Sequence, residues 1–276
     1  MANILFSNAY FYKFDEKQWR AKQPYPPYGT MYAAATMRDC GFEVNLFDTN
    51  LKDSPAEILQ VLENTKPQYL VIYDDGFNYL TKMCLTRMRE AAFELVKHGK
   101  KHGCIVIVNS SDSTDHYGEY LEQGADFVIL GEGEATLREL ITTVDGTRYT
   151  VHDVERIDFS KILGIAYCLN KSTPRQINRT ASRPVLHDLD SLPDPAWDLV
   201  DMEAYRQIWQ RHHSHFLLNL ATTRGCPFKC NWCAKPIYGN RYNSRSPERV
   251  VAEIQMLIEK FDTRHFWMSD DIFGLK

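Results

Sequence analysis

Three cysteines close together carry the strongest chemical signal in this chain. They lie in the segment Thr-Thr-Arg-Gly-Cys-Pro-Phe-Lys-Cys-Asn-Trp-Cys, at C-x3-C-x2-C spacing, and are Cys226, Cys230 and Cys233. A short loop of this kind can wrap one soft-metal centre, because thiolates bind zinc, copper(I) and iron–sulfur clusters. A structural zinc ion needs a fourth ligand, whereas a [4Fe–4S] cluster held by three cysteines leaves one iron open for a substrate or cofactor. The count of three therefore favours an iron–sulfur cluster.

Two other interpretations of the loop stay open. One is a zinc knuckle completed by a histidine, although the candidate histidines do not follow the usual short spacing from the thiolates; they are His212, His213, His215 and His265. The other is a reactive thiol pair or plain buried cysteines. The remaining thiols are scattered singly and are expected to be small buried side chains; they are Cys40, Cys84, Cys104 and Cys168.

Small polar residues follow the apolar runs in the first half of the chain. Ligands of open parallel sheets bind beyond the carboxyl ends of the strands. Gly131 and Gly133 would let backbone approach a ligand, and Glu132 and Glu134 could accept hydrogen bonds from hydroxyl or amide groups. No G-x-G-x-x-G motif follows the first apolar run, which argues against a dinucleotide site. The other strand-end residues are Asp48, Asp74, Asp75, Asn109, Ser110, Ser111 and Asp112.

The elements that position these residues can be read from hydrophobic periodicity. Continuous apolar runs alternate with helical patterns, as expected for strands that are covered on both faces. The expected strands are Asn3–Ser7, Glu43–Asp48, Tyr69–Tyr73, Cys104–Val108 and Phe127–Leu130. The expected helices include Thr30–Cys40, one that starts at a capping box on Ser54, and Leu80–Lys101. Five such βα units predict a doubly wound, five-stranded parallel sheet over residues 1–146.

The second half first interrupts this alternation of strand and helix patterns and then resumes it. Prolines interrupt residues 147–215, which are expected to form a connector with a small hairpin near Gly164–Asn170. A new βα pattern starts with the strand Phe216–Ala221, continues through the cysteine loop to a helix capped by Ser246, and ends in the strand His265–Ser269. The apolar stripe predicted to face the core of that helix is Val250, Val251, Ile254, Leu257, Ile258 and Phe261.

Composition narrows the class of protein. The chain has 276 residues, of which 44% are hydrophobic and 25% charged, and its net charge is −4. These values indicate a globular protein of about two domains and exclude a disordered, collagen-like or disulfide-scaffold protein. No apolar stretch approaches the ~20 residues of a membrane helix, and the first residues show no secretory signal. We therefore expect a cytoplasmic protein with no nucleic-acid partner and no membrane partner.

At the cysteine loop the chain resembles the radical S-adenosylmethionine (SAM) superfamily, whose signature is C-x3-C-x-aromatic-C. The resemblance implies that the three cysteines hold a [4Fe–4S] cluster and that Trp232 lies beside the adenine of SAM. It further implies reductive cleavage of SAM to a 5′-deoxyadenosyl radical, with electrons from a reductant such as flavodoxin or ferredoxin. Asp270 and Asp271, in Ser-Asp-Asp-Ile-Phe, resemble the Asp-Asp-x-Phe variant of cobalamin-linked members and by that resemblance would bind SAM. Arg224 and Lys235 flank the loop and could balance its thiolates, but solvated surface charge is the default expectation.

The order of features along the chain resembles the cobalamin-binding subgroup, which includes C-methyltransferases and the anaerobic magnesium-protoporphyrin ester cyclase. A Pro-Pro-x-Gly loop precedes the second strand, Gly-Glu-Gly-Glu follows the fifth, and the connector segment Leu189–Asp198 looks like the lead into the barrel of that subgroup. The resemblance implies cobalamin without a protein histidine ligand, because no D-x-H-x-x-G motif is present. The residues it assigns to cobalamin are Pro27, Gly29, Asp74, Asp75, Ser110, Ser111, Gly131, Glu132, Gly133 and Glu134.

By the same resemblance, residues 216–276 are the first βα units of a partial TIM-like radical SAM barrel. A six-unit partial barrel should need about 190 residues by proportion to the eight-unit barrel, so we expect a chain truncated within it. The predicted function is a cobalamin-dependent radical SAM enzyme that methylates or cyclises a small-molecule substrate at an unactivated carbon. The alternatives are a radical SAM enzyme without cobalamin, in which Asn109–Asp112 replaces the Gly-Gly-x-His of many relatives, and a non-enzymatic α/β module with a zinc knuckle.

Overall fold

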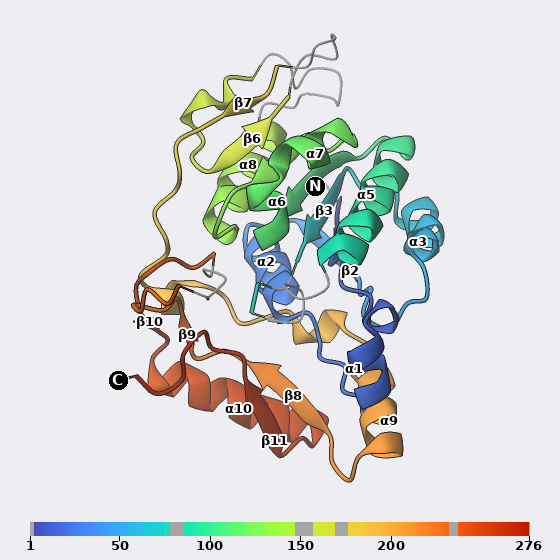
Figure 1. Cartoon of the computed structure of the whole chain (residues 1–276), viewed down its shortest axis with the longest axis vertical. Coiled ribbons are helices and arrows are strands. Elements are labelled where there is room, and N and C mark those ends of the chain that lie inside the picture. The colour runs from blue at the N-terminus through green and yellow to red at the C-terminus, as the bar shows by residue number, and fades with distance from the viewer. Residues whose placement is uncertain are drawn as a thin grey trace.

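The first half of the chain folds around one sheet. The computed structural model describes residues 3–74, 76–77, 85–146, 157–168, 176–231 and 237–275. Seven strands form the sheet in the order β2-β1-β3-β4-β5-β6-β7 (Figure 1). The first five are parallel; they are β1 (Asn3–Ser7), β2 (Glu43–Phe47), β3 (Tyr69–Tyr73), β4 (Ile105–Asn109) and β5 (Phe127–Ile129). The order 2-1-3-4-5 is that of a doubly wound sheet, so the predicted fold class is confirmed.

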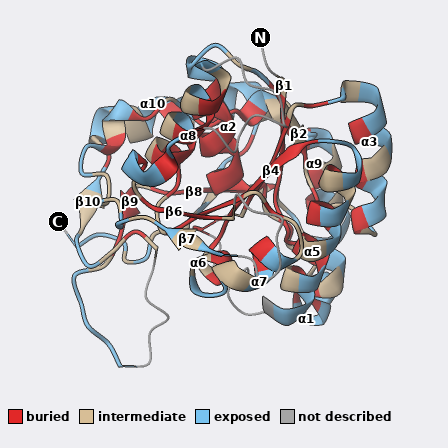
Figure 2. Cartoon of the chain, turned by 90° about the horizontal axis from the view of Figure 1, so that it is seen from above, coloured by how far each residue is buried: buried red, intermediate tan, exposed pale blue. Residues whose placement is uncertain are grey.

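Helices cover both faces of the sheet, because alternate strand residues point to opposite sides. On one side Ile4, Val71 and Ile107 pack against α2 (Tyr28–Asp39) and α8 (Glu134–Gly146). On the other side Leu5, Ile72 and Val106 pack against three helices; they are α3 (Ile58–Thr65), α5 (Leu85–Lys101) and α7 (Tyr117–Glu122). Figure 2 shows the buried strands between helices whose outer faces are exposed.

The connector contributes to the sheet, which the sequence did not predict. Its strands β6 (Ile165–Tyr167) and β7 (Asn178–Arg179) add antiparallel to the edge at β5. A strand of three residues is too short to show which edge it will join, and the hairpin was expected only as a local feature. The connector also contains the 3-10 turns η5 (Leu189–Ser191) and η6 (Trp197–Leu199), followed by α9 (Met202–His212).

The last part of the chain is a βαβ unit. Strands β8 (Leu217–Leu220) and β11 (His265–Met268) are parallel neighbours, joined through α10 (Pro247–Phe261). A short ladder between β9 (Thr223–Arg224) and β10 (Asn243–Ser244) spans the loop that follows β8. The remaining short helices are α1 (Glu16–Ala21) and α6 (Ser111–Asp115), and the turns are η1 (Tyr12–Phe14), η2 (Pro55–Glu57) and η4 (Phe159–Lys161). No helix in the described part of the chain is both long enough and apolar enough to cross a bilayer.

Two expectations about burial are wrong. In the stripe predicted to face the core of α10, Leu257 is buried, but Val251 and Ile258 are exposed. The stripe is wider than the surface that β8, β11 and the first half cover in this structure. Cys40, expected to be a buried thiol, is also exposed, because it lies at the C-terminal end of α2. Cys104 is buried as expected, Cys168 is only partly buried, and Cys84 lies outside the described residues.

Candidate functional site

The cysteine loop begins at the carboxyl end of β8. Of its thiols, Cys226 is half-buried and Cys230 is exposed, and neither is in a disulfide. Trp232 and Cys233 lie outside the described residues, so the third thiol and the aromatic residue of the motif stay predictions. Two free thiols at the strand end of a βαβ unit, one of them open to the exterior, fit a soft-metal centre that keeps one side accessible.

Two acids at the end of the neighbouring strand hold the backbone of this loop. Asp270 accepts hydrogen bonds from the backbone nitrogens of Thr222 (2.7 Å) and Thr223 (2.6 Å) and from the Thr222 hydroxyl (2.8 Å). Asp271 accepts one from the backbone nitrogen of Gly225 at 3.0 Å. Both acids were predicted to bind SAM, and that role is untested; the contacts show that they orient the start of the cysteine loop.

Gly225 makes the close packing of the loop possible. Its φ is +80°, in the left-handed region, and a Cβ atom there would lie 2.2 Å from the carbonyl oxygen of Arg241 and 2.8 Å from that of Tyr238. Only glycine avoids both problems. The next residue is tied down as well, because the backbone nitrogen of Cys226 donates to the carbonyl of Gly239 at 3.4 Å. The first cysteine of the motif therefore starts from a well-held piece of backbone.

Arg224 joins this loop to the first half of the chain. Its side chain is 3% exposed and donates to Glu132 at 2.5 Å and to Glu134 at 2.8 Å. Three aromatic rings surround the guanidinium, with centroids 4.8–5.4 Å away; they belong to Tyr32, Phe77 and Tyr238. Burial by itself raises the pKa of Glu132, and the charge of Arg224 opposes that shift. The expectation that Arg224 is a solvated surface charge is wrong.

Sequence reasoning missed this cluster because its parts are distant in the chain. The Gly-Glu-Gly-Glu turn was noticed, but its carboxylates were assigned to a cofactor, and a single arginine beside a cysteine loop carries no sign of burial. The available signal was complementary charge: two acids at the end of a buried strand need a cation when they are covered.

The other candidate cobalamin residues occupy varied positions. Pro27 and Gly29 are buried at the start of α2. Ser110 caps α6 by exchanging hydrogen bonds with Ser113, and Ser111 is the first residue of that helix. Gly131 has φ +78°, and among the described residues a Cβ there would meet only the carbonyl of Ile237, at 4.0 Å.

Two more of these candidates have structural partners, and one is not described. A Cβ at Gly133 would lie 2.7 Å from the ring of Tyr73, so this glycine lets β3 and the β5–α8 turn approach each other. Asp74 accepts a hydrogen bond from the backbone nitrogen of Ala9 at 3.3 Å. Asp75 lies outside the described residues. Of the two glycines in the Gly-Glu-Gly-Glu turn, Gly131 therefore has the more open surroundings.

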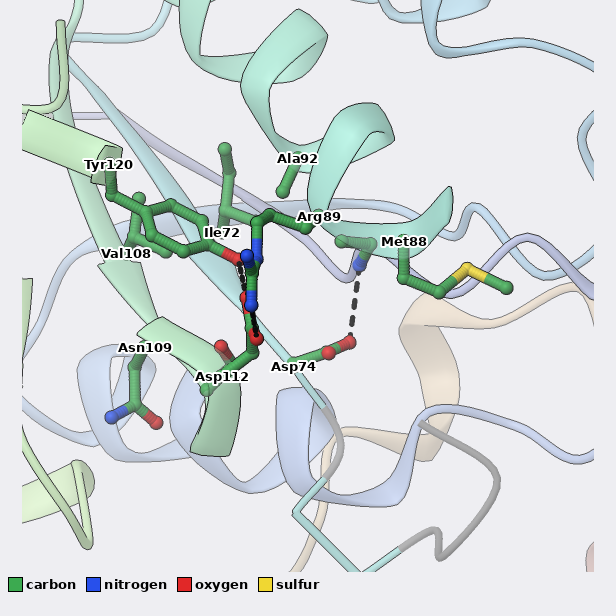
Figure 3. Close-up of a pocket in the computed structure, with 11 residues that line it drawn as sticks. Ile72, Asp74, Met88, Arg89, Ala92, Val108, Asn109, Asp112 and Tyr120 are labelled. Carbon is green, nitrogen blue, oxygen red and sulfur yellow. Dashed lines mark hydrogen bonds and ion pairs between the residues drawn. The ribbon is translucent and has the colours of Figure 1, made fainter. Parts of the chain in front are cut away.

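A small cavity lies at the carboxyl ends of β3 and β4 (Figure 3). Its volume is about 10 Å3, and Asp74, Asn109 and Ser110 are among its lining residues. Arg89 reaches from α5 to bind Asp112 with two hydrogen bonds, of 2.6 and 2.8 Å. Arg89, Asp112 and the other described residues around this cavity leave room there for about one water molecule.

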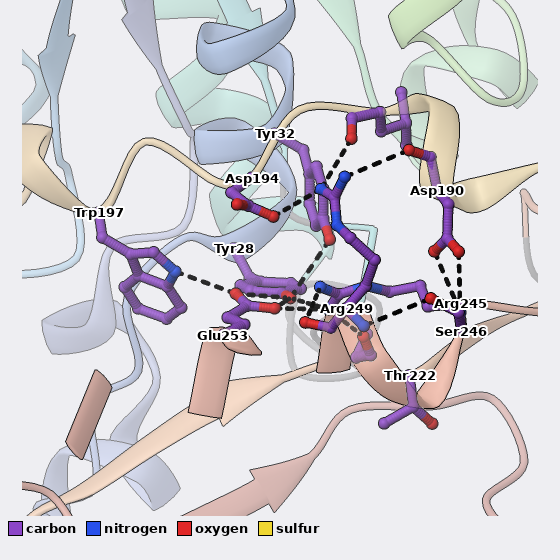
Figure 4. Close-up of polar contacts among 12 residues, drawn as sticks. Tyr28, Tyr32, Asp190, Asp194, Trp197, Thr222, Arg245, Ser246, Arg249 and Glu253 are labelled. Atoms are coloured by element: carbon purple, nitrogen blue, oxygen red, sulfur yellow. Dashed lines mark hydrogen bonds and ion pairs between the residues drawn. The ribbon is translucent and has the colours of Figure 1, made fainter. Parts of the chain in front are cut away.

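A second buried cluster lies where the connector, α2 and α10 meet (Figure 4). Glu253 on α10 accepts hydrogen bonds from the Tyr28 hydroxyl at 3.0 Å, from the Trp197 indole at 3.0 Å and from Arg245. Arg245 also donates to the carbonyl of Ala221 at 3.1 Å. Because these residues come from four segments, the cluster fixes the two halves of the chain against each other.

The histidines proposed for a zinc knuckle are at the wrong end of the strands. His215 and His265 stand at the starts of β8 and β11, with rings 4.6 Å apart, whereas the cysteine loop follows the other end of β8. His213 contacts the carbonyl oxygens of Ala21 and Lys22, and His212 ends α9. Within the described ranges, no group of three or more potential ligands surrounds a metal position.

The chain is similar in sequence to two kinds of curated enzyme. It is 27% identical over 253 residues to the anaerobic magnesium-protoporphyrin IX monomethyl ester cyclase of Synechocystis sp., covering 91% of this chain and 46% of the cyclase. It is 24% identical over 241 residues to the hopanoid C-3 methylase of Methylococcus capsulatus, covering 84% of this chain and 40% of the methylase. The chain thus spans less than half the length of either relative. No family model matches it.

A solved structure shares the fold. OxsB, described as a cobalamin-dependent S-adenosylmethionine radical enzyme, was solved with aqua-cobalamin bound. It superimposes with a TM-score of 0.72 at 17% identity, over 99% of this chain and 34% of OxsB. At that identity the likeness concerns the fold alone. The cyclase and methylase relatives are enzymes. The resemblance to the magnesium-protoporphyrin ester cyclase and C-methyltransferase group, predicted from the cysteine loop and the order of features, is confirmed by these relatives. The match to OxsB confirms the predicted fold.

Proposed function

We propose that this chain forms the corrin-module and cluster-bearing part of a radical SAM enzyme that methylates or cyclises a small molecule at an unactivated carbon. One observation carries the proposal: the cysteine loop is held at the carboxyl end of β8 by Asp270, and Arg224 joins it to the strand ends of the doubly wound sheet. Ligands of such sheets bind at those strand ends. A centre on the loop would therefore face a ligand of the first half.

In this proposal each group of residues has a separate task. Cys226, Cys230 and Cys233 hold a [4Fe–4S] cluster with one iron left open, and Trp232 packs beside the adenine of SAM. Asp270 and Asp271 orient the loop through its backbone nitrogens. When bound, the cluster would supply the electron that cleaves SAM to a 5′-deoxyadenosyl radical, and cobalamin would carry the methyl group in a methylation. A flavodoxin-like or ferredoxin-like donor would reduce the cluster.

The predicted division of the chain into three parts is kept here. Residues 1–146 would form the corrin module, 147–215 the connector and 216–276 the cluster-bearing unit. Gly131 would allow close approach of a corrin, because the nearest described atom to a Cβ there is the carbonyl oxygen of Ile237, at 4.0 Å. From the relatives we infer only that the substrate is a small molecule that is methylated or cyclised.

Anaerobic reconstitution tests the cluster assignment. The chain is incubated with iron and sulfide, desalted and analysed for both. A triple variant (Cys226→Ala, Cys230→Ala, Cys233→Ala) is treated in the same way, and so is the matched control Cys40→Ala, whose exposed thiol lies at the end of α2. We expect about four irons and about four sulfides per chain in the parent and the control, and none in the triple variant. Equal iron in the triple variant, or tightly bound zinc in the parent, would overturn the assignment.

One observation favours a second candidate, a radical SAM enzyme without bound corrin. Glu132 and Glu134, which were expected to face cobalamin, are instead hydrogen-bonded to the buried guanidinium of Arg224. Titration with hydroxocobalamin separates the two candidates by visible absorption. A saturable spectral change that is weakened in Gly131→Leu supports the corrin module, whereas no change in the parent chain supports the second candidate.

A further inference from the structure

The Gly-Glu-Gly-Glu turn touches the cysteine loop through its two acids. Glu132 and Glu134 lie at the start of α8, and both bind the guanidinium of Arg224, which comes two residues before Cys226. All three side chains are at most 9% exposed. Charge-assisted hydrogen bonds in a buried setting are strong and directional, so they set the position of the group they hold.

The surroundings allow Arg224 little freedom. Its backbone is part of β9, which pairs with β10, and the following Gly225 is held by Asp271 and closed in by neighbouring carbonyl groups. The rings of Phe77 and Tyr238 lie on its guanidinium. Only two peptide bonds separate Arg224 from Cys226. A shift of the Arg224 side chain and backbone should therefore also shift the position of Cys226.

The two acids also differ from a typical cofactor-binding pair. Glu132 accepts a second hydrogen bond from the backbone nitrogen of Leu186 at 2.6 Å, which ties the turn to the connector. Among the described residues, no donor reaches the Oε2 atom of Glu134, although that atom is buried. The turn is thus anchored on one side, and its second acid binds Arg224 through a single oxygen.

We propose that Arg224, Glu132 and Glu134 form a positioning unit that sets the cysteine loop for SAM, and that the two acids serve the cluster rather than the corrin. This inference rests on the proposed function. Arg224 is a positioning residue, because it touches neither thiol and acts through the backbone that leads to Cys226. The unit makes the geometry of the cluster depend on the strand-end turn of the other half of the chain.

The test compares two conservative variants of this positioning unit with a control variant at a different arginine. Glu134→Gln keeps a hydrogen-bond acceptor but loses the charge, and Arg224→Lys keeps the charge but loses the two-pronged contact. The control is Arg183→Met, because Arg183 binds Thr136 and Glu139 on the same helix and makes no hydrogen bond or ion pair with the described part of the cysteine loop, residues 222–231. Each protein is reconstituted with iron and sulfide, and its reduced cluster is titrated with SAM by electron paramagnetic resonance.

We expect the two test variants to load iron and to bind SAM about tenfold more weakly than the parent, the loss expected for one charged hydrogen bond. Arg183→Met should lower the melting temperature but keep the SAM affinity of the parent. SAM affinity equal to the parent in both test variants would overturn the positioning role, and so would an equal loss in Arg183→Met. If the parent itself takes up no iron, the proposed function fails, and the positioning role fails with it.

Discussion

Two buried arginines link the halves of this molecule, and they differ in what surrounds them. Arg245 meets Glu253, whose carboxylate also accepts hydrogen bonds from Tyr28 and Trp197. Arg224 meets two carboxylates, and one oxygen of Glu134 has no donor among the described residues. Both side chains are at most 5% exposed.

The difference separates a structural cluster from a positioning one. The acid of the Arg245 cluster sits on a long helix, α10, and its hydrogen-bonding capacity is well used. Arg224 binds a turn between a strand and a helix, next to the proposed metal ligands. Removal of either arginine leaves a buried carboxylate without its cation, which destabilises the folded state. Loss of either arginine should therefore lower the free energy of unfolding by a similar amount, but the two losses should differ in their effect on SAM affinity.

The largest expected effect comes from Arg245→Met. The variant leaves the fully buried Glu253 without its cation, so we expect a loss of about 3–5 kcal/mol in the free energy of unfolding. Urea denaturation measures it. Iron content and SAM affinity per folded chain should match the parent, because the Arg245 side chain binds the carbonyl of Ala221, which precedes the cysteine loop, and not the residues next to Cys226.

A milder variant covers the case in which Arg245→Met does not fold. Trp197→Phe removes only the indole donor to Glu253, and a hydrogen bond to a charged group is worth about 1.5–3 kcal/mol. If SAM affinity falls with stability in Trp197→Phe, the two clusters are not functionally distinct, and the comparison fails.

A smaller loss of stability, confined to the loop, is expected for Gly225→Ala. The added Cβ would meet the carbonyl of Arg241 at a backbone angle that alanine rarely adopts, a strain of about 1–3 kcal/mol. The melting temperature should fall by less than in Arg245→Met, while iron uptake after reconstitution should fall strongly. Gly41→Ala is a matched control, since Gly41 also has a positive φ but has open space around it. Normal iron uptake in Gly225→Ala would show that the loop does not need this packing.

Sequence analysis predicted the strands and helices that follow from local hydrophobic periodicity. It missed the features that depend on contacts between residues distant in the chain. The five parallel strands follow from continuous apolar runs such as Tyr69–Tyr73, and the capping box at Ser54 is present. The addition of β6 to the sheet edge and the burial of Arg224 depend on partners far away in the chain. The exposure of Val251 shows the same limit, because an apolar stripe does not reveal what covers it.

The last effect depends on pH and concerns a third contact between the halves, in which Asp48 accepts a hydrogen bond from Tyr205 at 2.6 Å. Burial raises the pKa of Asp48 to about 6. The folded chain thus binds this proton more tightly than the unfolded chain, whose Asp pKa is about 3.9. The protonated form contributes stability that is fully present below about pH 4 and is lost as the pH rises through about 6.

The variant Asp48→Asn removes that titration. Relative to the parent, its free energy of unfolding should rise between pH 4 and pH 7, by at most about 3 kcal/mol, because each pKa unit corresponds to about 1.4 kcal/mol. Urea denaturation across this pH range measures the difference. A constant difference between the two proteins would show that Asp48 does not titrate in this window.

The central claim is that the cysteine loop holds a cluster whose open iron binds SAM. Electron paramagnetic resonance of the anaerobically reconstituted, reduced chain, recorded with and without SAM, tests it most directly. The account predicts the signal of a reduced [4Fe–4S] cluster that changes when SAM is added and is absent when Cys226, Cys230 and Cys233 are replaced by alanine. A cluster signal that SAM leaves unchanged, or no cluster signal at all, would contradict it.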